Sequence, residues 1–261
     1  MSPRPLALVT GASSGIGAHL ATVLAERGHD LVLVARGVDR MEALGEKLKA
    51  AHGVAVHVVG LDLTSIGAGA RLEAELAARG LAVDVLVNNA GFGLRGRFVE
   101  LDAARQMEMI QLNVTVLVDL TRRFLPGMVE RKRGGVLNVA STAAFQAGPY
   151  MAIYYASKAF VLSFSDALAI ELEGTGVAVT CLCPGPTESE FANVAGMSDS
   201  PLFKLNAPMS AEEVAQQGVV SLLGGGGTVI PGFANKLGAW GAGMAPRSVA
   251  ARLAAKMQPP S

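Results

Sequence analysis

The sequence predicts an α/β fold: a doubly wound parallel sheet of about seven strands, with helices on both faces. Short apolar runs alternate along the chain with longer segments in which apolar residues recur at helical spacing. The short runs are mostly continuous valine and leucine, which is typical of parallel strands buried on both faces. The predicted strands are Leu6–Val9, Leu31–Ala35, Val54–Val59, Val83–Val87, Val136–Val139, Val177–Leu182 and Thr228–Ile230.

The segments between these strands have the spacing of amphipathic helices. After the first strand, Ile16, Leu20 and Leu24 recur at helical intervals, and Gly28 follows as a C-cap. No linker-like tract occurs before residue 185, so we expect the whole chain to form one domain. Further helices are predicted over Asp102–Phe124, Ala152–Glu173, Asn235–Met244 and Arg247–Met257.

The composition excludes several classes of protein. The chain has 261 residues, 22 lysines and arginines against 22 aspartates and glutamates, and a net charge of zero. This balance argues against a nucleic-acid binder, and it gives no strong electrostatic pull toward an acidic membrane surface. The hydrophobic share of 51% excludes a disordered chain. Cys181 and Cys183 are the only cysteines, so we expect neither a disulfide framework nor a zinc site.

The N-terminal residues predict a strand rather than a targeting segment. The apolar run Leu6–Val9 ends at Thr10-Gly11, and it is shorter than the apolar core of a secretory signal. No apolar stretch is long enough for a membrane-spanning helix. We therefore expect a cytoplasmic protein.

A glycine-rich turn joins the first strand to the first helix. Because helix N-terminal amides and the helix dipole favour negative charge, this geometry suits a pyrophosphate group. The spacing is Gly-x-x-x-Gly-x-Gly, and an ordinary strand–helix turn is the alternative reading. The residues expected to contact a dinucleotide here are Gly11, Ser13, Ser14, Gly15, Ile16 and Gly17.

The end of the second strand indicates which dinucleotide binds. An acidic residue there would bind the ribose hydroxyls of NAD, whereas an arginine accommodates the 2′-phosphate of NADP. Arg36 follows the strand directly, Arg40 comes one helical turn later, and no acid stands at the strand end. These residues predict NADP(H), preferred over NAD(H).

Three residues suggest acid–base chemistry. Tyr154 and Lys158 are four apart in a predicted helix, so their side chains share one face. A cation beside a phenol lowers its pKa, which would make Tyr154 a general acid or base near neutral pH. Ser141 follows a buried strand at its carboxyl end, where ligands bind in open α/β sheets. Alone, a tyrosine–lysine pair could equally be a surface pair.

Together these motifs resemble the short-chain dehydrogenases/reductases, a family of oxidoreductases with a Rossmann-type fold. The resemblance covers residues 6 to about 191 and is looser beyond them. It looks most similar to a bacterial branch of broad specificity. The matching motifs are Thr10–Gly17, Asp62, Asn88-Asn89-Ala90-Gly91, Asn113, Ser141, Tyr154, Lys158 and Pro184-Gly185.

The resemblance implies a role for each catalytic position. Tyr154 would exchange the proton with the substrate oxygen, and Ser141 would hydrogen-bond that oxygen. Lys158 would hold the nicotinamide ribose and lower the pKa of Tyr154, and Asn113 would anchor a water that connects Lys158 to solvent. The further cofactor contacts implied are Asp62, Leu63, Asn89, Ala90, Gly91, Pro184, Gly185 and Thr187.

By the same resemblance, residues 186–210 form a substrate lid and residues 232–261 a C-terminal helical tail. Apolar side chains predominate in the lid and near the other expected walls, so we expect an apolar ketone, aldehyde or secondary alcohol as substrate. The same side chains could simply pack the lid onto the body. They are Phe191, Val194, Met197, Leu202, Phe203 and Leu205 in the lid, and Phe92, Leu94, Phe145, Pro149 and Met151 in the walls.

The resemblance also implies a homodimer or homotetramer, joined through the two long helices. Their apolar stripes would meet between subunits, although such stripes also suit packing on the sheet. The stripes are Met107, Ile110, Val114 and Leu117, and Phe160, Phe164, Leu168 and Leu172.

The sequence therefore predicts an NADP(H)-dependent oxidoreductase that moves a hydride between nicotinamide and a carbonyl or secondary alcohol. The alternative is a non-catalytic dinucleotide-binding regulator. Such proteins typically lose the tyrosine or the lysine, and here all four catalytic positions are filled.

Overall fold

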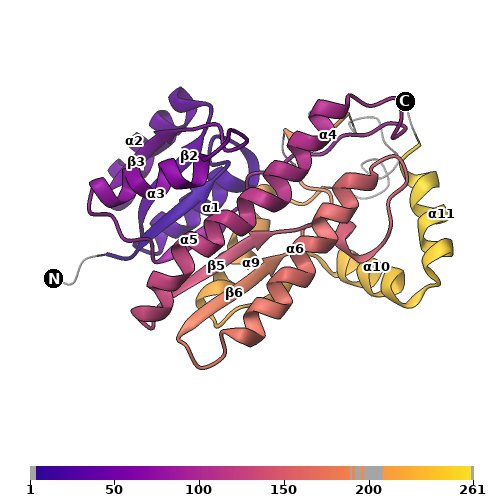
Figure 1. The fold of residues 1–261 in the computed structure, drawn as a ribbon. Coiled ribbons are helices and arrows are strands. Elements are labelled where there is room, and N and C mark those ends of the chain that lie inside the picture. The colour runs from indigo at the N-terminus through magenta and orange to yellow at the C-terminus, as the bar shows by residue number, and fades with distance from the viewer. Residues whose placement is uncertain (1–3, 189, 192–194, 197–207, 260–261) are drawn as a thin grey trace.

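The computed structural model describes residues 4–188, 190–191, 195–196 and 208–259. Its parallel sheet has seven strands within these residues, in the order β3-β2-β1-β4-β5-β6-β7, and helices cover both faces (Figure 1). This confirms the predicted fold class. The strands are β1 (Leu6–Thr10), β2 (Asp30–Ala35), β3 (Val56–Gly60), β4 (Val85–Asn88), β5 (Gly134–Val139), β6 (Val177–Leu182) and β7 (Gly227–Val229).

The strand order reverses next to β1, which pairs with β2 on one side and with β4 on the other. The chain that follows β2 packs on one face of the sheet, and the chain that follows β4 packs on the opposite face. A crevice therefore opens between these connections, outside the carboxyl ends of the strands. The sheet topology thereby fixes where a ligand can enter the fold.

Helices α1 (Gly15–Glu26), α2 (Val38–His52) and α9 (Ala211–Leu223) pack on one face of the sheet. Helices α3 (Ala68–Ala78), α5 (Leu117–Glu130) and α6 (Ala152–Glu171) pack on the other. The remaining helices are α4 (Ala103–Ile110), η1 (Gln111–Val116), η2 (Thr142–Phe145), α10 (Phe233–Met244) and α11 (Arg247–Met257).

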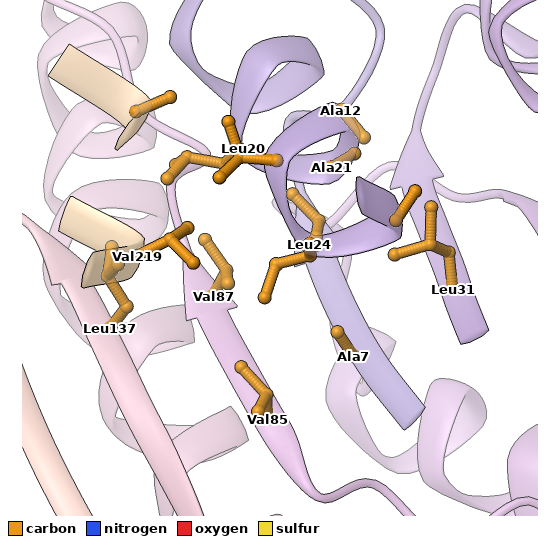
Figure 2. Close-up of a cluster of buried hydrophobic side chains, with 14 of the residues drawn as sticks. Ala7, Ala12, Leu20, Ala21, Leu24, Leu31, Val85, Val87, Leu137 and Val219 are labelled. Carbon is orange, nitrogen blue, oxygen red and sulfur yellow. The ribbon is translucent and has the colours of Figure 1, made fainter. Parts of the chain in front are cut away.

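Alternate residues of β1 enter opposite layers of the core. Ala7 and Val9 pack with the α1 side, while Leu6 and Leu8 pack with the other side. In Figure 2, Leu20 and Leu24 of α1 lie over Val87 of β4. Because both faces of the strand are covered, every position must be apolar, which explains the continuous runs in the sequence.

The predicted helix 102–124 is in fact interrupted. The α-helix α4 gives way to the π-helical segment η1 before α5 begins, and α5 continues through Pro126 to Glu130. An extra residue in a helical turn rotates a side chain out of the regular register, and such turns occur often at functional sites. Here the rotated turn contains Asn113.

Both tail helices were predicted within two residues of their observed ends. They follow one another at an angle, at the end of the molecule opposite the N-terminus (Figure 1). Across the described ranges, no helix is long and apolar enough to cross a membrane.

Candidate active site

A cleft of about 790 Å³ opens at the carboxyl edge of the sheet. Every residue predicted to contact the cofactor lines it, as do Ser141, Tyr154 and Lys158. Asn113 is buried behind the wall, 2% exposed. The structure thus brings together at one edge groups that lie up to 176 positions apart (Gly11 and Thr187) in the sequence.

The glycine turn is held in shape by side chains from β1 and from the loop after β4. The Thr10 hydroxyl accepts hydrogen bonds from the backbone amides of Asn89 and Ala90 at 3.0 and 3.1 Å. The Asn89 side-chain amide donates to the carbonyl oxygens of Thr10 and Gly11 at 2.9 and 3.3 Å. A Cβ on Gly17 would stand 2.3 Å from the Gly11 oxygen, so only glycine fits there. The Asn89 side chain therefore supports the turn itself.

The N-terminus of α1 fits a phosphate group. Ser14 is the N-cap, yet it makes no side-chain capping hydrogen bond, and the first turn contains no acidic residue. Amides of a first turn have no partner within the helix. Since Ser14, Gly15 and Ile16 line the cleft, these donors suit the pyrophosphate of a dinucleotide.

The two arginines predicted near the 2′-phosphate have different surroundings. Arg36 lies close enough to Asp62 for its charge to lower the pKa of that carboxyl, although the hydrogen bonds from Thr64 contribute more to the shift. Arg40 forms an ion pair with Glu190, at 3.0 Å. Glu190 belongs to the predicted lid, so this pair joins the lid to α2, which the sequence did not indicate.

The phenol of Tyr154 is buried beside Ser141. Burial raises the pKa of Tyr154, and the nearby Ser141 hydroxyl offsets only part of that rise. The Lys158 ammonium lies 5.8 Å from the centre of the tyrosine ring and donates to the Val139 carbonyl oxygen at 2.7 Å. Burial lowers the pKa of Lys158 to about 8.

In this structure the charge of Lys158 is not among the causes of the pKa shift of Tyr154, and its role in lowering that pKa stays a prediction. The ammonium points to a backbone carbonyl, and the loss of water around the phenol is the larger effect. A buried phenol keeps its proton more firmly than one in water.

Asn113 connects the loop after β4 to α6. Its Nδ2 donates to the Phe92 carbonyl oxygen at 3.0 Å and to Oγ of Ser157 at 3.1 Å. Its Oδ1 accepts from the Phe92 amide at 3.1 Å. A Cβ on Gly91 would stand 2.9 Å from that Oδ1 and 3.7 Å from Nζ of Lys158. Gly91 thus lets the loop, Asn113 and Lys158 approach closely.

At the substrate end, the predicted walls are correct only in part. Phe92 and Met151 line the cleft, and Phe191 of the lid lies with its ring 5.2 Å from that of Tyr154. Among the described residues, Leu94, Phe145 and Pro149 do not line it. The other predicted lid residues, Val194, Met197, Leu202, Phe203 and Leu205, lie outside the described residues.

One wall was missed by the sequence analysis. Small residues of α10 close the cleft beside Gly185, and Asn235 comes so close to this glycine that a Cβ on it would stand 2.3 Å from Oδ1 of Asn235. The sequence does contain a signal for this wall, because alanine or glycine recurs at every fourth position of α10, at Ala234, Gly238 and Ala242. The lining residues of α10 are Ala234, Asn235, Gly238, Ala239 and Ala242.

Tyr155 binds the end of the tail to the body. Its hydroxyl donates to Oε1 of Gln258 at 3.0 Å, and Nε2 of Gln258 donates to the Pro149 carbonyl oxygen at 3.1 Å. Gln258 is buried, and its side chain bridges α6 and the loop before it. Neither residue was singled out for this contact from the sequence.

Comparison with known proteins identifies the family. The family model described as short chain dehydrogenase matches residues 5–198. An NADP-dependent 3-hydroxy acid dehydrogenase from Salmonella typhi is 39% identical over 193 residues, 72% of this chain and 75% of the relative. A short-chain dehydrogenase from Sphingobium yanoikuyae in complex with NADPH is 37% identical, with a TM-score of 0.81 over 91% of this chain and 92% of that one. A bulky-bulky ketone specific alcohol dehydrogenase from Comamonas testosteroni is 32% identical, with a TM-score of 0.76 over 89% and 90%.

The chain belongs to the short-chain dehydrogenase/reductase family. It is an oxidoreductase that acts on CH–OH and C=O groups, as its relatives are.

The buried ammonium of Lys158 makes the stability of the fold depend on pH. The pKa of Lys158 is lowered to about 8 in the folded chain, so between this value and about 10.5 the unfolded chain binds the proton more strongly. The stability of the wild type relative to Lys158→Met should therefore rise with pH. Between about pH 7.5 and 9.5 the change should be on the order of 1–2 kcal/mol, measured by urea unfolding.

The matched control is Lys47→Met, which removes an exposed ammonium that solvent reaches in both the folded and the unfolded chain. Its stability difference from the wild type should stay constant over the same range. A constant difference for Lys158→Met as well would contradict the burial of a charged Lys158.

Proposed function

We propose that this protein is an NADP(H)-dependent oxidoreductase that transfers a hydride between nicotinamide and the carbonyl or secondary alcohol of an apolar substrate. The observation that carries the proposal is that Tyr154 and Ser141 both line the cleft that holds the glycine turn at its other end, with Ser141 close enough to affect the pKa of the phenol. When bound, the cofactor supplies or accepts the hydride. A non-catalytic role is not favoured because every group required for proton transfer stands in this cleft.

The cofactor would lie along the carboxyl edge of the sheet. The first-turn amides of α1 would hold its pyrophosphate, and Asp62 and Leu63 would meet the adenine. Arg36 and Arg40 would bind the 2′-phosphate, with Arg40 exchanging its present partner Glu190 for the phosphate. The NADPH complex of one relative and the NADP-dependent name of another support this assignment.

Tyr154 would exchange the proton with the substrate oxygen. Because burial raises its pKa, the phenol is protonated before reaction, which suits the donation of a proton during carbonyl reduction. Ser141 would hydrogen-bond the same oxygen. Lys158, with a pKa of about 8, is mostly an ammonium at pH 7 and would hold the nicotinamide ribose hydroxyls.

The substrate end favours an apolar ketone over a hydroxy acid. Phe92, Met151 and Phe191 surround Tyr154. Arg105 also lines the cleft, but its guanidinium is paired with Glu108 and lies over the Phe92 ring, 4.5 Å from the centroid. A substrate carboxylate would have to compete with Glu108 for that arginine. The bulky-ketone specificity in the name of one structural relative points to the same class.

Removal of the phenol hydroxyl should abolish turnover. We expect Tyr154→Phe to lower the rate of ketone reduction by roughly 10² to 10⁴-fold, the usual contribution of a positioned general acid. The affinity for NADPH should change little, because the hydroxyl acts on the substrate. The measurement is NADPH oxidation with a panel of apolar aryl ketones, together with NADPH binding by calorimetry.

Tyr155→Phe is the matched control one residue away. Its hydroxyl binds Gln258 rather than the substrate, so turnover should persist while stability falls by about 1 kcal/mol. If Tyr154→Phe kept more than about a tenth of the wild-type rate, the acid–base assignment would be wrong.

Arg36 should decide the choice of cofactor. We expect NADP(H) to bind at least ten-fold more tightly than NAD(H), a gap of about 1.4 kcal/mol or more. Arg36→Asp should reverse this preference, because a carboxylate repels the 2′-phosphate and accepts the ribose hydroxyls of NAD. Lys47→Asp makes the same charge change on the surface of α2 and should leave the preference intact. Equal affinities in the wild type would exclude the assignment.

We also propose a homodimer or homotetramer joined through the two long helical stretches, which are α4, η1 and α5 in one case and α6 in the other. Leu117 and Leu172 of the predicted stripes are buried within the chain's own core, so they are not available to a second subunit. Met107 and Phe160 are exposed, as an interface requires.

Light scattering should give a mass of at least twice 26.8 kDa, and Phe160→Glu should dissociate the assembly. A wild-type mass equal to one chain would exclude it.

A further inference from the structure

Helix α10 has two opposite faces with different surroundings. The small residues that line the cleft all lie on its inner face. On the outer face, Phe233, Leu237, Trp240 and Met244 are 83%, 65%, 72% and 86% exposed. Their spacing of three and four residues places them in one stripe. The helix is therefore a thin wall with the cleft on one side and an apolar surface on the other.

Helix α11 extends this surface. Val249 and Leu253 are also exposed, four residues apart, while Ala250 and Ala254 face the body and are buried. The buried Gln258 fixes the end of the helix to Tyr155. The two helices are thus packed on the body, and together they present what we call the tail patch: Phe233, Leu237, Trp240, Met244, Val249 and Leu253. Exposed apolar side chains gathered on adjoining helices are typical of interaction sites.

The segment that carries the tail patch contains charges of one sign only. Residues 232–261 contain four basic side chains and no aspartate or glutamate, although the whole chain has a net charge of zero. All four basic side chains are exposed, and Arg252 and Lys256 lie on the same face of α11 as Val249 and Leu253. The four are Lys236, Arg247, Arg252 and Lys256. The segment 232–261 therefore carries an excess of positive charge that the net charge of the whole chain does not reveal.

We infer that the tail patch docks on the surface of an anionic lipid bilayer. Aromatic and aliphatic side chains on one face of a helix, with basic residues beside them, bind at the boundary between headgroups and acyl chains. Lysine and arginine stems can lie along the apolar surface while their charges reach lipid phosphates. At 12 and 11 residues the helices are too short to span the bilayer, so they lie in its surface.

The charges disfavour a second copy of the chain as the occupant of this surface. A two-fold interface brings the same patch of each copy together. It would set the four cations of one copy against the four of the other, whereas an anionic membrane neutralises them.

Trp240 is the only tryptophan of the chain, so its fluorescence reports on the tail patch alone. With phosphatidylcholine vesicles containing about 30% phosphatidylglycerol, its emission should shift to the blue, and the protein should float with the vesicles. Pure phosphatidylcholine vesicles should give neither result, and about 0.5 M salt should weaken the binding.

Two double variants separate the apolar and the charge contributions. Leu237→Ser with Met244→Ser, and Arg252→Glu with Lys256→Glu, should each lower vesicle binding by at least about ten-fold. None of these side chains lines the cleft, so cofactor binding in buffer should be unchanged, which shows that the variants fold. Ile66→Ser and Lys47→Glu make matched changes at exposed positions elsewhere and should bind vesicles as the wild type does.

Three results would overturn the inference. The wild type could fail to float with anionic vesicles, or either double variant could bind them as well as the wild type does. Alternatively, light scattering could show that a double variant lowers the mass of the assembly, in which case a second copy covers the tail patch. Vesicle binding requires no turnover, so these outcomes are independent of the proposed reaction.

Discussion

The site depends on the hydrogen bonds that fasten the loop after β4 to the turn between β1 and α1. Thr10 and Asn89 make these bonds across the point where the strand order reverses. They fix the glycine turn, and they also fix the start of the loop that continues to Gly91. From there Asn113 binds the backbone of Phe92 and the hydroxyl of Ser157, one residue before Lys158. A continuous polar network therefore joins the phosphate end of the cleft to its catalytic end.

The low polarity around Tyr154 and Lys158 is a second consequence of this packing. Burial disfavours the charged form of both groups, so it raises the pKa of the phenol and lowers that of the ammonium. In water a phenol and an alkyl ammonium have nearly equal proton affinities, and the two shifts move the affinities of Tyr154 and Lys158 apart. The hydrogen bond from Lys158 to the Val139 carbonyl oxygen holds the ammonium where it is poorly solvated.

The sequence predicted those parts of the molecule whose causes are local in the chain. The central strands were recognised because burial on both faces leaves a continuous apolar run, and the glycine turn because its spacing reflects close backbone approach. The interruption at Asn113 could not be predicted, since it depends on contacts with Phe92 and Ser157, 21 and 44 residues away. The Arg40–Glu190 and Tyr155–Gln258 contacts span 150 and 103 residues and were missed for the same reason. Leu117 was assigned to a subunit interface because helical spacing alone does not distinguish an inner face from an outer one.

The wall formed by α10 affects how this enzyme can diversify. The match to the family model ends at residue 198, before this helix begins. Its inner face is built almost entirely of alanine and glycine, so single mutations can add side-chain volume there but can hardly remove any. Point mutations in this segment, which contains no proton-transfer group, can therefore narrow the cleft and favour smaller substrates. The catalytic side chains and the width of the cleft at α10 can then change by independent mutations.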